Sequence, residues 1–203
     1  MKAGEFKAQD GWREVVLDHM NHSVDVTRNA AQSGVDSIVR AAELIVECFR
    51  SEHKLLICGN GGSAADAQHL AAEFVNRLDS SFERPGLPAI ALTTDTSFLT
   101  AYANDCGYDG VFERQVTTLG NRSDVLLAIS TSGNSLNLIK AVNAGRARGL
   151  ITIGLLGAGG LLTDLVDHAV IVESRDTQHI QECFLPIEHS ICLVVERALF
   201  GTK

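Results

Sequence analysis

The sequence lacks several features that would assign it to a particular class of protein. It has no run of about 18 apolar residues, so we expect no membrane-spanning helix and no membrane partner. Its first residues, Met1 to Phe6, contain no apolar stretch typical of a signal peptide, and we expect a cytoplasmic protein. Positive charge is also scarce, because 17 Lys and Arg stand against 25 Asp and Glu. The resulting net charge of -8 argues against nucleic acid as a partner, although a local site can still bind a small anion.

Cysteine is present, but not in a pattern that suggests paired function. No two cysteines form a C-x-x-C motif, and most stand among apolar residues. We therefore favour reduced, buried thiols over a catalytic thiol. The five cysteines are Cys48, Cys58, Cys106, Cys183 and Cys192.

The first quarter of the chain predicts two helices. Apolar residues recur at helical spacing from Trp12 to Ala31 and again from Val35 to Phe49, with a break at Ser33-Gly34. The first helix has a narrow apolar stripe, which fits packing in a helical bundle across a subunit interface. A helix that only covers its own domain is the alternative. We treat residues 1–203 as one domain, with a helical segment at about 8–51 and an α/β core at about 54–203.

Beyond residue 53, short apolar runs alternate with helical stretches. Such alternation predicts a parallel sheet covered by helices on both faces. The expected strands are 55–58, 89–92, 125–129, 151–156 and 169–172. The expected helices are 64–78, 98–104, 111–119, 136–148, 161–166 and 179–199.

A glycine-rich loop follows the first expected strand. Asn60-Gly61-Gly62-Ser63 connects this strand to a helix, where free backbone N–H groups and the helix dipole attract anions. Ser63 and Asp66 fit a capping box with Ser63 as N-cap, and the Ser63 hydroxyl is also a candidate ligand contact.

A second polar loop follows the third expected strand. Ser130-Thr131-Ser132-Gly133-Asn134-Ser135 places four hydroxyls before a helix that begins near Ser135. One hydroxyl is enough to cap a helix, so the surplus favours a phosphate site over an ordinary serine cap.

Acid/base residues lie on two of the expected helices. His69 and Glu73 are four residues apart and share one helix face, which suits a metal pair, an acid/base pair or a structural histidine. In the last helix, Gln181 and His189 are two turns apart and can face one cavity. By themselves, Gln181 is typical of a surface and His189 of a core.

Taken together, these segments resemble the sugar isomerase (SIS) domain family, and within it the phosphoheptose isomerases. The resemblance covers nearly the whole chain. It rests on residues 58–63, 66–69 with Glu73, 84–91, Asn104-Asp105, Gly120, 124–127, 129–135, 180–182 and His189. It implies a flavodoxin-like five-stranded parallel sheet flanked by helices, with N-terminal helices that pack in a homotetramer.

The resemblance also implies an activity and a set of site residues. The activity is the interconversion of sedoheptulose 7-phosphate and D-glycero-D-manno-heptose 7-phosphate through an enediol, the first step towards ADP-heptose. The implied zinc ligands are His69, Glu73, Gln181 and His189. The implied substrate contacts are Asn60, Gly61, Gly62, Ser63, Glu73, Asn104, Asp105, Ser130, Thr131, Ser132, Ser135 and Gln181.

The implied chemistry gives Glu73 the role of base at carbon and His189 that of acid/base at the sugar oxygens. Two positions depart from the family pattern. Phe184 stands where some family members have a further histidine, so no role is assigned to it. Pro186 lies inside the last expected helix, where proline tends to produce a kink.

Two rival functions remain open at this point. One is a non-catalytic SIS protein that binds a bacterial replication initiator. In that relative the catalytic glutamate and the late histidine are missing, whereas this chain has Glu73 and His189 at those positions. The other is an SIS isomerase or sensor for a different phosphosugar. The presence of Gln181 and His189 argues against the glucosamine-type members.

Overall fold

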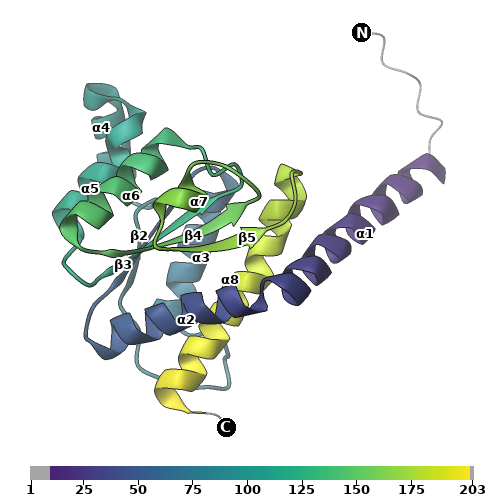
Figure 1. Ribbon diagram of the computed structural model, residues 1–203, viewed down its shortest axis with the longest axis horizontal. Coiled ribbons are helices and arrows are strands. Elements are labelled where there is room, and N and C mark those ends of the chain that lie inside the picture. The colour runs from purple at the N-terminus through teal and green to yellow at the C-terminus, as the bar shows by residue number, and fades with distance from the viewer. Residues whose placement is uncertain (1–9, 202–203) are drawn as a thin grey trace.

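A five-stranded parallel sheet forms the centre of the fold in the computed structural model, which describes residues 10–201 (Figure 1). The strand order is β2-β1-β3-β4-β5. Continuous apolar runs form these strands because both faces of the sheet are covered. The strands are β1 (Leu55–Gly59), β2 (Ala89–Ala91), β3 (Val125–Ser130), β4 (Ile151–Gly157) and β5 (His168–Val172).

The sheet divides the core into two apolar layers, and helices cover each of them. Leu55 and Ile57 of β1 pack with α2, α3 and α8, whereas Leu56 and Cys58 pack with α5, α6 and α7 on the other face. The helices are α1 (Asp10–Ser33), α2 (Val35–Arg50), α3 (Gly62–Val75), α4 (Thr96–Cys106), α5 (Val111–Leu119), α6 (Leu136–Arg148), α7 (Leu162–Leu165) and α8 (Thr177–Phe200), with a 3-10 turn η1 at Tyr108–Gly110.

The α/β architecture predicted from the sequence is confirmed, and the boundaries differ by a few residues. The largest difference is at α3, which begins at Gly62 rather than at residue 64 and ends at Val75 rather than at 78. α8 continues through Pro186 as one helix. The expectations for Met1 to Phe6 and for a helix start near residue 8 lie outside the described residues.

The order of the strands creates a crevice between β1 and β3. The chain passes from β1 to β2 on one side of β1, whereas β3 lies on the other side. Gly59 and Ile129 are paired at the carboxyl ends of these two strands. The loops that follow β1 and β3 therefore diverge around a crevice of the type in which α/β proteins bind ligands.

Helix α1 meets the two-layered core with its C-terminal part, and its N-terminal part projects away from that core (Figure 1). Of the described apolar residues of α1, Ala30 alone is buried. Trp12, Val16 and Met20 are 57–60% exposed along one side of the helix. Within residues 10–201, no helix is both long and apolar enough to cross a membrane.

The cysteine interpretation also agrees with the structure. All five thiols are free, and every one except Cys106 is buried. Burial raises the pKa of the Cys58 thiol to about 12, so this thiol stays protonated at neutral pH and is a poor nucleophile.

Candidate functional site

A small polar cleft lies at the carboxyl ends of β1 and β3. Its volume is about 80 Å³, and most of its lining consists of hydroxyl and amide side chains. Both sequence-predicted loops contribute to it. The lining residues are Asn60, Ser63, Ile129, Ser130, Thr131, Ser132 and Ser135.

Glycines shape the first loop of the cleft. Gly61 is the N-cap of α3 and has φ 56° and ψ -120°, a conformation that L side chains rarely adopt. A Cβ at Gly59 would lie 2.4 Å from the carbonyl oxygen of Ser63. The turn from β1 into α3 is therefore tight, and Ser63 of the first helical turn lines the cleft.

The predicted capping box at this loop is wrong. Because Gly61 is the N-cap, Ser63 lies inside the first turn of α3 and makes no capping hydrogen bond. Its hydroxyl instead donates to Oε1 of Gln181 at 3.0 Å. The amide of Gln181 also donates to Asp66, so α3 and α8 are joined beside the cleft. Gly62 permits this contact, since a Cβ there would lie 3.1 Å from Oε1 of Gln181.

The hydroxyls of the second loop have two different roles. Ser130 Oγ accepts a hydrogen bond from the N–H of Gly133, and Ser132 Oγ accepts one from the N–H of Asn134. These two bonds hold the loop in shape. Ser135 is the N-cap of α6, yet its hydroxyl accepts no hydrogen bond from that helix. Its side chain therefore remains available to a ligand.

A pair of asparagines ties the two loops together. The side-chain amide of Asn60 donates to Oδ1 of Asn137 at 2.9 Å, and Asn137 donates back to Oδ1 of Asn60 at 2.8 Å. The hydroxyl of Tyr108 also donates to Asn60. Asn137 was not predicted as a site residue, and its position two residues after the helix-capping Ser135 was the available signal.

The acid/base side chains of α3 and α8 meet across the packed helices. Nε2 of His69 lies 2.8 Å from Nε2 of His189, and Nδ1 of His69 lies 3.8 Å from Oε1 of Glu73. Two imidazoles and a carboxylate therefore gather at one place. Gln181 is turned towards Ser63 and Asp66, so its amide does not join this group in the structure.

Two further carboxyl groups lie beside the site, and neither was predicted to belong to it. Burial raises the pKa of Asp66 to about 6, and the nearby His69 opposes that rise. Burial raises the pKa of Glu188 to about 9, and the Asp66 carboxylate raises it further. Both oxygens of Glu188 are buried without a hydrogen-bond partner within the described structure.

Among the predicted substrate contacts, Asn104 and Asp105 neither line the cleft nor form a side-chain hydrogen bond with a residue that lines it in the described structure. Both lie at the exposed end of α4, where the side chain of Asn104 donates to Oδ1 of Asp105 at 2.8 Å. Neither is among the residues that line the cleft. The adjacent Tyr108 is the connection from this segment to Asn60.

Comparisons with known proteins give a consistent result. A family profile described as SIS domain matches residues 18–157. A phosphoheptose isomerase of Roseiflexus sp. strain RS-1 is 52% identical over 192 residues, which is 94% of this chain and 96% of the relative.

Solved structures agree with these sequence matches. A phosphoheptose isomerase of Neisseria gonorrhoeae superposes with a TM-score of 0.85 at 42% identity, over 91% of this chain and 98% of that chain. One of Francisella tularensis superposes with a TM-score of 0.84 at 33% identity, over 91% and 97%.

Proposed function

This chain belongs to the SIS domain family and, within it, to the phosphoheptose isomerases, and we propose that its site interconverts sedoheptulose 7-phosphate and D-glycero-D-manno-heptose 7-phosphate. The observation that carries this proposal is the juxtaposition at α3. The helix starts at a hydroxyl-lined cleft and, two turns later, presents His69 and Glu73 next to His189. One short element thus combines an anion site with acid/base groups. The same groups disfavour the non-catalytic, initiator-binding alternative.

The cleft between β1 and β3 is suited to the phosphate end of the substrate. It offers the hydroxyls of Ser63, Thr131 and Ser135 together with the N-termini of α3 and α6. None of the described residues that line it is a lysine or an arginine. A phosphate would therefore be held by hydrogen bonds and helix dipoles, and its fixed position would set the distance from the sugar carbons to Glu73.

Glu73 and His189 supply the proton transfers of an aldose–ketose isomerisation. Glu73 would take the proton from one of the two carbons and return it to the other. His189 would move a proton between the two sugar oxygens, so that the intermediate is an enediol. The carboxylate of Glu73 is only 18% exposed, and partial shielding from water strengthens its interaction with His69.

The residues on α3 and α8 also fit a zinc ion. The two Nε2 atoms of His69 and His189 face each other, and two imidazoles, a carboxylate and an amide oxygen are ligands that zinc accepts. His69 and His189 would hold the ion through these atoms, and Glu73, which lies at Nδ1 of His69, and Gln181 would join them only after changes of rotamer. When bound, zinc would polarise the sugar oxygens and stabilise developing negative charge.

We also propose that the protein is a homotetramer assembled through α1. The apolar side of α1 projects from the core, so its own domain cannot cover it (Figure 1). Residues repeat along this side at four-residue spacing, which suits packing against the same helix of other copies.

The test of the proposed activity is an NMR assay of heptose 7-phosphate formed from sedoheptulose 7-phosphate. Glu73→Gln keeps the size of the side chain but removes the base, and we expect turnover to fall by a factor of about 10² to 10⁴. Glu83→Gln is the matched control, because this carboxylate is 95% exposed and its ion pair is with Arg77, outside the proposed acid/base group. Equal turnover in wild type and Glu73→Gln would exclude the assigned role.

A further inference from the structure

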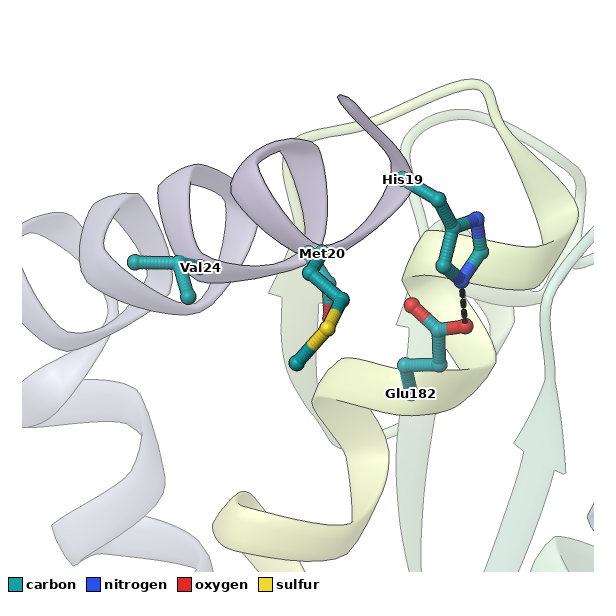
Figure 2. A pocket seen from close by; sticks show the side chains of 5 residues that line it. His19, Met20, Val24 and Glu182 are labelled. Atoms are coloured by element: carbon teal, nitrogen blue, oxygen red, sulfur yellow. Dashed lines mark hydrogen bonds and ion pairs between the residues drawn. The ribbon is translucent and has the colours of Figure 1, made fainter. Parts of the chain in front are cut away.

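A second group of metal-ligating side chains lies where α1 crosses the start of α8. His19 belongs to α1, and His179 and Glu182 belong to α8. Ligand atoms of all three lie within 4.8 Å of one another. Figure 2 shows His19 pointing from α1 towards Glu182. We propose that these three residues bind a divalent transition metal of the zinc type, at a site separate from the catalytic centre.

The distances within this group are close to those of a metal shell. Nε2 of His19 is 2.6 Å from Oε1 of Glu182, and Nδ1 of His179 is 3.0 Å from Oε2. Ligands of a tetrahedral zinc ion lie roughly 3.3 Å apart, given bonds of about 2.0–2.1 Å. Small outward movements would therefore admit an ion. His179 and Glu182 are one helical turn apart, a spacing by which helices present a histidine and a glutamate to one metal.

The surroundings of the group supply two further features of metal sites. Oδ2 of Asp176 lies 3.9 Å from Nε2 of His179, the ring nitrogen that does not face Glu182. A small rotation would bring this carboxylate to hydrogen-bond distance, where it would orient His179 as outer-shell carboxylates orient metal-binding histidines. A cavity of about 240 Å³ adjoins the group and leaves room for a water molecule as fourth ligand. Its lining residues are His19, Met20, Ser23, Val24 and Glu182 (Figure 2).

An ion at this place would cross-link two helices that matter for the site. Without metal, Glu182 joins α1 to α8 through a half-exposed contact with His19, and such exposed pairs contribute little to stability. A metal bound by both helices would fix α1 firmly to the start of α8, directly beside Gln181. The metal would therefore have a structural role, holding the oligomer-forming helix against the helix that carries Gln181 and His189.

The test measures Co²⁺ binding to full-length, untagged protein from which metal has been stripped. His69→Ala serves as background, because it disables the catalytic histidine pair and leaves the new site as the main binder. We expect about one Co²⁺ per subunit, with the visible absorption of a four-coordinate ion. Adding His19→Ala should weaken binding by more than the roughly 10- to 100-fold that loss of an outer-shell partner costs.

Two further variants make the result decisive. His22→Ala is the control, since this exposed histidine lies on the same helix and is stacked beside His179 without a ligand atom in the group. It should leave Co²⁺ affinity unchanged. Glu182→Gln preserves side-chain size and should weaken binding as His19→Ala does, with circular dichroism confirming the fold. Absent Co²⁺ binding, or binding that neither His19→Ala nor Glu182→Gln weakens, would overturn the proposal.

Discussion

Glu188 shows what a single buried carboxyl group requires of its surroundings. Its side chain is fully buried, and neither oxygen has a hydrogen-bond partner within the described structure. A charged carboxylate in such a place would be costly, so the group keeps its proton. Burial, helped by the Asp66 carboxylate, raises its pKa from 4.5 to about 9. Glu188 is therefore neutral at physiological pH, although it lies next to His189.

This protonation predicts a pH dependence of stability. Between pH 4.5 and about 9 the folded chain holds a proton on Glu188 that the unfolded chain releases. The contribution of Glu188 to the free energy of unfolding is therefore complete below pH 4.5 and falls by about 1.4 kcal/mol per pH unit until pH 9. Glu188→Gln has no such proton and should lack this slope.

Urea unfolding of chelator-treated protein at pH 6, 7 and 8, at one protein concentration, measures the effect. The free energies of unfolding of wild type and Glu188→Gln should differ by a constant amount, because a buried amide also lacks hydrogen-bond partners. The decisive quantity is therefore the difference in how steeply the two free energies change with pH. Glu47→Gln, at an exposed position of α2, is the control and should follow wild type. Parallel lines for Glu188→Gln and wild type would contradict a protonated Glu188.

At the scale of elements, α8 carries residues of both proposed sites. It carries Gln181 and His189 and continues as one helix past Pro186. Proline lacks an N–H, so the carbonyl of Glu182 receives no hydrogen bond from position 186. The packing of α8 against α2, α3 and the sheet overrides this loss, because many buried apolar side chains hold the helix on both sides of it.

Replacement of Pro186 should therefore stabilise the chain. Pro186→Ala restores one helical hydrogen bond and should raise the free energy of unfolding by about 1–3 kcal/mol. Pro186→Gly restores the same N–H but has a lower helix propensity, so its gain should be about 1 kcal/mol smaller. Urea unfolding of the three proteins measures both differences. A loss of stability in both variants would show that the proline ring itself stabilises α8.

For the whole molecule, the exposed side of α1 has the largest consequence. Trp12, Val16, Met20 and Val24 are each more than half exposed on a helix that leaves the core. A stable monomer would rarely present such a continuous apolar surface to water. Assembly with other copies of this chain would cover it.

The assembly can be tested with one charge. Val16→Asp places a carboxylate in the middle of the apolar side, and its desolvation should prevent association. Light scattering after size exclusion should give about four times the chain mass of 21.8 kDa for wild type and a smaller species for the variant. Asp25→Asn, half a turn around the helix from Val16, is the control and should stay assembled. An unchanged mass for Val16→Asp would exclude this surface as the interface.

The sequence alone determined the elements and their order. Apolar periodicity is a local property, so the runs from Leu55, Val125 and Ile151 and the helices between them could be predicted. The polar loops that follow the strands could also be predicted from the local pattern. Because the carboxyl ends of parallel strands lie at one edge of the sheet, these loops were expected to meet there. The cleft formed by residues 60–63 and 130–135 was therefore predictable.

Only the tertiary structure decided which side chains meet between helices. His69 and His189 are 120 residues apart, Ser63 and Gln181 are 118 apart, and His19 and Glu182 are 163 apart. Such contacts depend on the rotation and tilt of α1, α3 and α8, which the packing of the whole core sets. The first turn of α3 depended on the unusual backbone of Gly61, and the pKa of Glu188 on complete burial. A periodic pattern shows which face of a helix is apolar, but it does not reveal which residue of another helix that face will touch.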